Sequence, residues 1–245
     1  KTDGTVPQDD ATTQDPPAAP NVWFNEIHYD NVSTDANEFV EIVLENPGNY
    51  ALSDISVYLV NGNGGAIYNT KTLDLFTVGS SYGNFTIYTY TYPVDGIQNG
   101  DPDGMAIAYQ GILVPGQFLS YEGTFTGAEG AVNSVLSSNI NVAEGSNTPT
   151  GYSLQLSGAG TQYSDFSWMS EAPNTLGAVN NQQSFSATTT WDGSVDTDWD
   201  NASNWSDGLP VMGSDVSIPV VSNLPVLSSS ATIGDLTIAN GAGLT

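Results

Sequence analysis

The stretch VWFNEIHYDNVSTDANEFVEIV, residues 22–43, decides the fold class of this 245-residue chain. Two runs of aromatic and branched apolar residues, each broken by single polar residues, flank a segment of Asp, Asn, Ser and Thr. This alternation indicates two β-strands joined by a polar loop. In the first strand it predicts two faces, one with Trp23, Asn25, Ile27 and Tyr29 and the other with Phe24, Glu26 and His28.

Similar segments rich in Val, Ile, Tyr, Phe and Thr recur as far as about residue 184, and Gly, Asn, Asp and Pro separate them. One of them, VNGNGGAIY, predicts a hairpin with a glycine-rich turn. No window keeps a helical period. We therefore predict an all-β protein whose main part, residues 21–184, is a β-sandwich.

Composition divides the remainder of the chain. Residues 1–20 combine Pro, Asp, Thr and Ala, which is typical of an extended leader or linker. A Thr-rich linker over 185–190 precedes a small β unit over 191–245, which contains three of the five tryptophans. This unit ends in NGAGLT, a turn that leads toward a strand, so we predict that it is incomplete and begins a β-solenoid.

Charge excludes several classes of partner. Asp and Glu total 27 against two lysines, Lys1 and Lys71, for a formal net charge of −25. Phosphate backbones require Lys and Arg, so nucleic acid is not an expected partner, and the same reasoning disfavours anionic membrane surfaces. No apolar run reaches the ~18 residues needed to insert into a bilayer. Such a negative field attracts cations, and its oxygen donors suit calcium.

The residues needed for catalysis are scarce. The chain has no cysteine and a single histidine, His28, which lies in a predicted strand without a Gly-x-Ser-x-Gly motif. Phosphoryl transfer and nuclease chemistry usually need basic residues near the reacting phosphate, and the folded part offers one lysine. We predict no catalytic residue, and we interpret His28 as a structural strand residue. Glycoside hydrolysis, which needs only two carboxylates, stays open as an alternative.

Two acidic segments are candidate calcium sites. If the strands of the opening stretch pair, Glu26 and Glu41 approach each other, and two close carboxylates need a cation, a proton or solvent. The first candidate set is Glu26, Asp30, Asp35, Glu38 and Glu41, and the second is Asp192, Asp196, Asp198 and Asp200. The alternative for the first set is a polar turn with solvated charges. Trp199 and Trp205 could stack on a sugar, or could pack under a loop.

A series of motifs, in order, is similar to the bacterial form of the lamin tail domain over about residues 21–184. The motifs are FNEIHYDN, EFVEI, VYLVNGNGGAIYNT, IQNGDPDGMAIAY, FLSYEGTF, EGSNTPTGYSLQLSGAGTQYSDFSW and TLGAVNNQQ. Leu176 stands where that family commonly has proline. The resemblance implies an immunoglobulin-like β-sandwich that serves as a non-catalytic module of large secreted or cell-surface proteins, often beside nucleases, phosphatases or adhesive repeats.

The tail resembles a segment of secreted bacterial surface proteins, in which W-x-G and D-W-x-x-x-x-NW precede P…D-V-x-I-P. This resemblance implies export, frequently by the type IX secretion route, and a larger parent protein. From both resemblances we expect a secreted adhesion, display or spacing module whose partners are other domains of its parent, or surface glycans or proteins. The alternative is a protein that binds or hydrolyses glycans.

Overall fold

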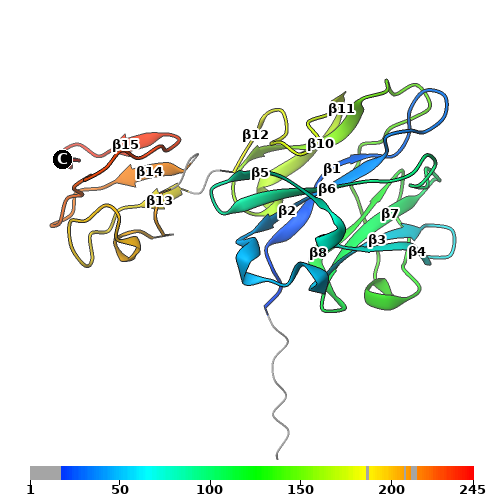
Figure 1. Ribbon diagram of the computed structural model, residues 1–245, viewed down its shortest axis with the longest axis horizontal. Helices are drawn as coiled ribbons and strands as arrows, with labels where there is room; N and C mark the ends of the chain where they lie inside the picture. Colours follow the sequence, from blue (N-terminus) through cyan, green and yellow to red (C-terminus); the bar gives the residue numbers. More distant parts are fainter. Residues whose placement is uncertain (1–17, 186–187, 207, 211–213) are drawn as a thin grey trace, which may run out of the picture.

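The computed structural model describes residues 18–185, 188–206, 208–210 and 214–245 and is all-β (Figure 1). The predicted leader over 1–20 lies mostly outside these residues. Two larger sheets form between residues 22 and 184, and a small third sheet forms from residue 188 onward. In the described part of the chain every helix is a single 3-10 turn of three residues, too short to cross a membrane.

The first sheet has seven strands. Six follow the order β11 (Phe166–Pro173), β10 (Tyr152–Ala159), β1 (Val22–His28), β2 (Phe39–Glu45), β6 (Phe85–Thr91) and β5 (Thr77–Tyr82). The short strand β12 (Gln183–Ser184) pairs in parallel with β10. The two predicted strands of the opening stretch, β1 and β2, are therefore antiparallel neighbours at the centre of this sheet.

The second sheet has five strands in the order β4 (Ile67–Thr72), β3 (Ile55–Asn61), β7 (Asp103–Tyr109), β8 (Ile112–Tyr121) and β9 (Ser138–Asn139). The hairpin predicted for VNGNGGAIY is confirmed as the antiparallel pair β3–β4. The short helices of this region are η1 (Pro47–Asn49), η2 (Leu52–Asp54), η3 (Leu73–Leu75), η4 (Gly130–Val132) and η5 (Tyr163–Asp165).

One apolar core joins the two sheets. Phe24, Ile27 and Ile42 of the first sheet pack in the same cluster as Val57 and Ile107 of the second. Side chains of one face of each sheet thus fill a shared interior, which is the arrangement of a β-sandwich. The predicted all-β class is confirmed.

The predicted alternation along β1 is wrong after Phe24. The β1–β2 register shifts between Phe24 and Glu26, so Asn25 is the extra residue of a β-bulge. Phe24 and Ile27 consequently share the sandwich core, whereas Trp23 lies in a second apolar cluster on the opposite face of the sheet. The bulge sends Asn25 and Glu26 together to that opposite face, where Asn25 bonds to Glu41.

Residues 174–185, here called the crossing segment, cover this outer face. Gly177 accepts a hydrogen bond from the backbone amide of Ser80 in β5, and Asn180 donates to the backbone of β1 and β10. Phe185 packs against Trp23 with ring centroids 6.1 Å apart. Strand β1 is therefore buried on both faces.

The third sheet is parallel and follows chain order, with β13 (Thr188–Thr190), β14 (Asp215–Ile218) and β15 (Leu236–Ile238). Helix η6 (Ala202–Asn204) lies in the long connection between β13 and β14. The tryptophan-rich unit thus has its own sheet and its own apolar cluster. That it begins a solenoid stays a prediction.

Candidate functional site

The feature that distinguishes this interior is a set of buried carboxylates of which only one has a basic partner among the described residues. Five acidic side chains are buried in the described part of the chain, and only one of them forms an ion pair there, with His28. Each of the five accepts a hydrogen bond from at least one backbone amide of a loop, and they are Glu26, Glu38, Glu41, Asp103 and Glu144. Buried carboxylates need such donors because their desolvation is otherwise unfavourable.

Glu26 and Glu41 face each other across β1 and β2, as expected if these strands pair. Glu26 accepts from the Thr175 amide at 2.9 Å and hydroxyl at 2.8 Å, and from the Ser153 hydroxyl at 2.5 Å. Glu41 accepts from the Gly177 amide at 2.7 Å. The two carboxylates therefore hold the start of the crossing segment on the sheet.

Burial raises the pKa of Glu26, and hydrogen bonds from Ser153 and Thr175 offset only part of this effect. Burial also raises the pKa of Glu41 well above its ordinary value, and the neighbouring charge of Glu26 adds to the rise. Two adjacent buried carboxylates are not both ionised readily. A proton on one of the two carboxyls therefore relieves the repulsion within this pair.

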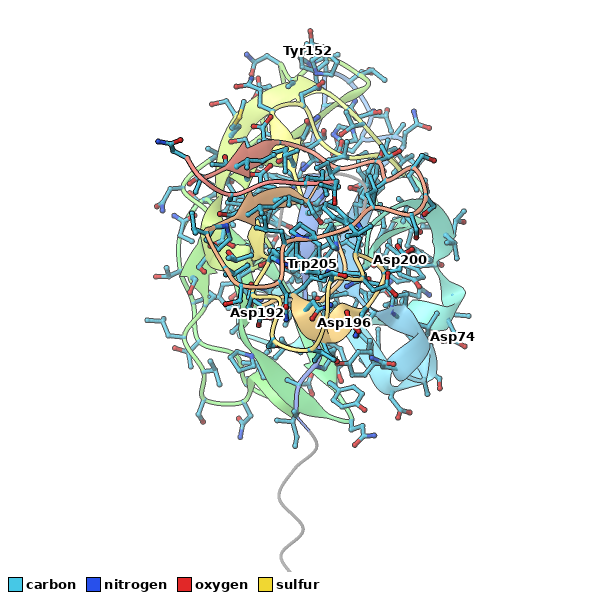
Figure 2. The ribbon with its side chains drawn as sticks, turned by 90° about the vertical axis from the view of Figure 1, so that its left-hand side faces the viewer. Asp74, Tyr152, Asp192, Asp196, Asp200 and Trp205 are labelled. Atoms are coloured by element: carbon cyan, nitrogen blue, oxygen red, sulfur yellow. The ribbon has the colours of Figure 1, made fainter. Side chains whose placement is uncertain are left out.

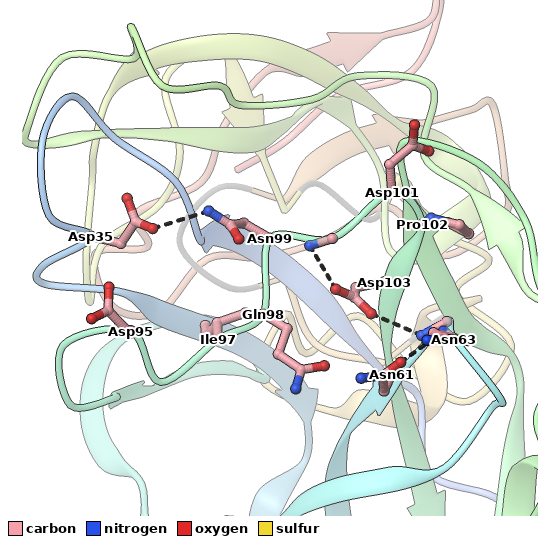
Figure 3. Close-up of a pocket in the computed structure, with 12 residues that line it drawn as sticks. Asp35, Asn61, Asn63, Asp95, Ile97, Gln98, Asn99, Asp101, Pro102 and Asp103 are labelled. Carbon is pink, nitrogen blue, oxygen red and sulfur yellow. Dashed lines mark hydrogen bonds between the residues drawn. The ribbon is translucent and has the colours of Figure 1, made fainter.

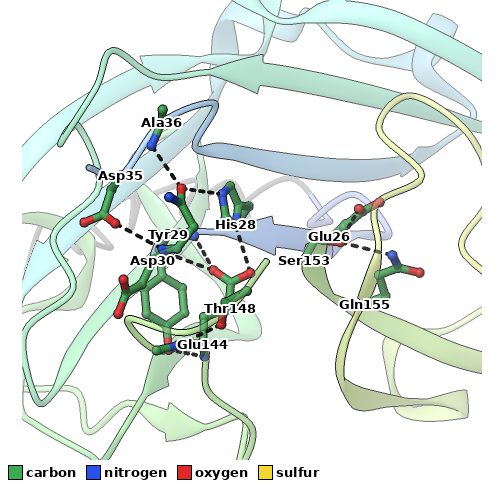
Figure 4. A network of polar contacts seen from close by, with 12 residues as sticks. Glu26, His28, Tyr29, Asp30, Asp35, Ala36, Glu144, Thr148, Ser153 and Gln155 are labelled. Carbon is green, nitrogen blue, oxygen red and sulfur yellow. Dashed lines mark hydrogen bonds and ion pairs between the residues drawn. The ribbon is translucent and has the colours of Figure 1, made fainter. Parts of the chain in front are cut away.

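His28 and Glu144 form a second buried pair, with 2.9 Å between His28 Nδ1 and Glu144 Oε1 (Figure 4). Glu144 Oε2 accepts the amides of Tyr29 at 2.6 Å and Asp30 at 3.0 Å, and His28 Nε2 lies 3.2 Å from Asn31 Oδ1. These contacts attach the loop around Glu144 to the end of β1. Every polar atom of the His28 ring is engaged in this attachment, which suits the structural role predicted from its place in a strand.

The pKa of His28 reflects two opposing causes. Burial lowers this pKa, but the hydrogen bond and the negative charge of Glu144 together raise it by more, so the net shift is upward. Burial raises the pKa of Glu144, although His28 and the two amides act against this. Each partner thus holds a proton more tightly than it would in water.

Glu38 and Asp103 fix the loops around an open cleft of about 840 Å³ (Figure 3). Glu38 accepts the amides of Gly96 at 2.6 Å and Ile97 at 3.0 Å. Asp103 accepts those of Gly62 at 2.8 Å and Gly100 at 2.7 Å. The turn NGDPDGMA is therefore supported by an Asp side chain. The cleft is polar and acidic, and its lining includes Asp35, Asp95, Asp101 and Asp103.

The residues predicted to bind calcium are distributed rather than gathered. Glu26, Glu38 and Glu41 are buried and hold loops, whereas Asp30 and Asp35 lie at the surface, with Asp35 in the cleft wall. Asp35 accepts the Asn31 amide and the Asn99 side chain, both at 3.0 Å. Among the described residues, no three or more His, Asp or Glu side chains are placed together as metal ligands.

The second acidic set lines an exposed loop (Figure 2). Asp192, Asp196 and Asp198 each accept the amide two residues onward, at 2.8, 2.9 and 3.1 Å, and the carboxylate of Asp200 lies 3.4 Å from the Ser228 hydroxyl. Asn204, which is buried, donates to Asp196 at 2.6 Å. The three bonds from amides two residues onward are those of successive Asx turns, which shape the loop.

The tryptophans lie beneath this loop. Trp191, Trp199 and Trp205 are buried with Val216 and Ile218, and the Trp199 and Trp205 rings meet edge to face at 4.7 Å. Trp205 Nε1 donates to the Trp199 carbonyl at 2.9 Å. Neither Trp199 nor Trp205 therefore presents a ring face on which a sugar could stack, and packing under a loop describes both.

Sequence reasoning missed the partners of the buried acids. Glu144, Thr175 and Gly177 lie more than 100 residues from the β1 and β2 residues they contact. A weak signal exists, since Glu144 and Asp103 each precede a glycine in a loop or strand end. Glycine is common where a backbone approaches another group closely, but this signal does not identify the partner.

No family model matches the chain, and neither a curated protein nor a solved structure shows a significant match to it. The resemblance to lamin tail domains therefore stays a prediction made from the sequence.

Replacing Thr175 with Val tests whether Glu26 holds the crossing segment. The substitution keeps the side-chain shape and the backbone amide but removes the hydroxyl that donates to Glu26. We expect the free energy of unfolding to fall by about 1–3 kcal/mol, because a buried acceptor loses a donor. Amide hydrogen exchange should accelerate in residues 174–185. Thr70→Val, at an exposed position on β4, is the control. Equal exchange in both variants would contradict the assignment.

Glu38 should make stability depend on pH in the direction opposite to ordinary acid denaturation. Burial raises its pKa to about 7, although the amides of Gly96 and Ile97 oppose this. Between its ordinary value of 4.5 and about 7 the folded state keeps a proton that the unfolded state releases. The free energy of unfolding therefore falls as pH rises through this window.

Urea unfolding from below pH 4.5 to above pH 7 measures this dependence. Glu38→Gln, which cannot titrate there, should reduce the fall in stability, whereas Glu171→Gln on the edge strand β11 should leave it unchanged. An unaltered pH dependence in Glu38→Gln would show that Glu38 is not the titrating group.

Proposed function

We propose that this chain is a non-catalytic extracellular module, used for adhesion, display or spacing within a larger secreted bacterial protein. The observation that carries the proposal is the use of the buried acids. All five bind loop backbones, so they fix the shape of the surface loops and are not presented to a substrate. A module that presents a surface or separates other domains requires this kind of rigidity.

Three further points support the proposal. The single histidine is buried with its ring nitrogens engaged by Glu144 and Asn31. Trp199 and Trp205 stabilise an interior instead of forming a sugar platform. The ordered motifs over 21–184 resemble a family of non-catalytic modules, whose partners would be domains of the same parent, or surface glycans or proteins.

Activity and binding assays on the purified chain test this proposal. We expect no turnover of polysaccharides, phosphate esters or nucleic acids. We also expect no glycan on an array to bind in a saturable way that survives competition with free sugar. Hydrolysis that is lost on replacing one acidic residue would overturn the proposal, and saturable glycan binding would favour the alternative. Intrinsic tryptophan fluorescence verifies that each variant keeps the packed Trp191, Trp199 and Trp205.

We also propose that calcium stabilises the folded chain, because a net charge of −25 on a compact body is relieved by any cation that only the folded state binds. At a calcium concentration of about 100 times Kd the stabilisation is about 2.7 kcal/mol. The melting temperature should therefore rise by several degrees in millimolar calcium, relative to sodium chloride of equal ionic strength.

Two variants locate the effect. Asp35→Asn removes a charge from the cleft, and Asp198→Asn removes one from the exposed loop of the tryptophan-rich unit. Loss of the calcium-specific shift in one of them assigns the ion to that part of the chain. Identical shifts with calcium and sodium in the unmodified chain, together with no stoichiometric heat of binding, would exclude a calcium site.

A further inference from the structure

A row of three oxygens beside the outer face of the first sheet has too few protons when Glu26 is ionised. Glu26 Oε2 lies 2.8 Å from the Thr175 hydroxyl, and the same hydroxyl lies 3.1 Å from Asn180 Oδ1. The hydroxyl is placed to donate to either neighbour, but it carries a single proton. The second contact of the row therefore needs a proton from another group.

The Asn180 side chain can only accept in this row. Its amide nitrogen donates to the Asn25 carbonyl at 2.8 Å and to the Leu156 carbonyl at 3.0 Å. A carbonyl has no proton to donate, so the amide group cannot be turned over. When both contacts of the row are hydrogen bonds, Thr175 donates to Asn180. The additional proton then lies on Glu26 Oε2, which donates to Thr175.

The other oxygen of Glu26 fits the carbonyl of a protonated acid. Glu26 Oε1 accepts the Thr175 amide at 2.9 Å and the Ser153 hydroxyl at 2.5 Å. The oxygen of that hydroxyl in turn accepts the Gln155 side-chain amide at 3.0 Å, and both residues lie beside Glu26 in Figure 4. The direction of every hydrogen bond at Glu26 is thus satisfied with one proton on Oε2.

Glu41 offers no comparable place for this proton. Its Oε1 accepts the Asn25 side-chain amide at 2.9 Å, and its Oε2 accepts the Gly177 amide at 2.7 Å. The orientation of Asn25 is fixed, because its Oδ1 accepts from Gln183, whose Oε1 accepts the Asn180 backbone amide. Both groups bonded to Glu41 are therefore donors, and a proton on Glu41 would face one of them.

Burial favours a proton on the pair, and the hydrogen bonds decide where it lies. Burial raises the pKa of both carboxyls, Glu26 opposes the ionisation of Glu41, and Glu144 opposes that of Glu26. Among the described residues, Glu171 of β11 forms no hydrogen bond with the pair. Strands β5, β6 and β10 and the crossing segment contain no Asp, Glu, His or Lys. The last proton to leave the pair therefore lies on Glu26.

We propose that a proton on Glu26 Oε2 holds the crossing segment on the first sheet, and that loss of this proton at higher pH lets the segment open. With the proton present, Glu26, Thr175 and Asn180 form one continuous row of hydrogen bonds. Without it, Thr175 donates to Glu26 and Asn180 Oδ1 loses its donor. Two adjacent buried carboxylates then repel each other beneath the segment.

Opening of the segment also changes how the tryptophan-rich unit is attached. Phe185, at the end of the crossing segment, packs in the apolar cluster that contains Trp23 and Phe166, and β13 begins at Thr188. The closed segment therefore fixes the point at which the chain leaves the sandwich. An open segment releases Phe185 from this cluster and lengthens the connection between the two units.

Hydrogen exchange of residues 174–185, corrected for the intrinsic exchange rate at each pH, tests the proposal in the full chain. The closed segment keeps a proton that the open segment releases above the ordinary glutamate value of 4.5. Protection should therefore fall about tenfold per pH unit above 4.5, until Glu26 is ionised in the closed state as well. Unchanged protection over this range would overturn the proposal.

Two variants decide which carboxyl holds the proton. Glu26→Gln replaces the protonated acid with an amide that accepts at Oε1 and donates from Nε2 to Thr175, so most of the pH dependence should disappear and the segment should stay protected. Glu41→Gln turns an amide donor toward the donor of Asn25 or Gly177, so protection should fall about tenfold at every pH. Glu171→Gln is the control and should behave as the unmodified chain does. A pH dependence that survives in Glu26→Gln, or full protection in Glu41→Gln, would overturn the proposal.

A carboxyl titration of the unmodified chain decides the question if either variant fails to fold, which near-ultraviolet circular dichroism reveals. Carbon-13 NMR follows the side-chain carboxyl carbons of Glu26 and Glu41 as the pH rises. We expect Glu41 to ionise first and Glu26 to ionise later, at a pH above 4.5. The reverse order, or two ionised carboxyls at pH 4.5, would show that the proton does not hold the segment.

Discussion

The structure depends on burying carboxylates that have almost no basic side chains to pair with in the described part of the chain. With two lysines in the sequence, the interior acids cannot be neutralised by salt bridges, and His28 serves only Glu144. Backbone amides donate to all five buried acids, and side chains such as Ser153 and Asn25 add further hydrogen bonds. Loops must therefore approach the sheet closely enough to donate, and each approach fixes one loop. The same requirement that satisfies the acids thus determines where the loops lie.

The bulge at Asn25 makes this arrangement possible in the central strand. It allows Phe24 and Ile27 to enter the sandwich core while Glu26 joins Glu41 on the outer face. The crossing segment then closes that face through Thr175, Gly177 and Phe185. Without the extra residue, strict alternation would place Glu26 on the same face as Phe24, in the apolar core between the sheets.

The two parts of the chain use acidic residues differently. In the sandwich, Glu26, Glu38 and Glu41 are buried, and their pKa values rise because desolvation disfavours the charged form. In the tryptophan-rich unit, Asp192, Asp196 and Asp198 are exposed and form Asx turns, and the pKa of Asp196 is lowered by its hydrogen bond from Asn204. Ionisation of the buried acids therefore lowers the stability of the sandwich, whereas ionisation of Asp196 raises that of the tryptophan-rich unit.

The sequence by itself determined the all-β class and the hairpin over VNGNGGAIY, because local alternation and turn residues encode these features. It also indicated that Glu26 and Glu41 meet if the two opening strands pair. Only the tertiary structure decided the bulge at Asn25, the loop contacts of Glu38 and Glu144, and the burial of Trp199 and Trp205. These depend on residues far apart in the chain. A carboxylate's role follows from its donors, and no local pattern in the sequence specifies which distant amide will supply the hydrogen bond.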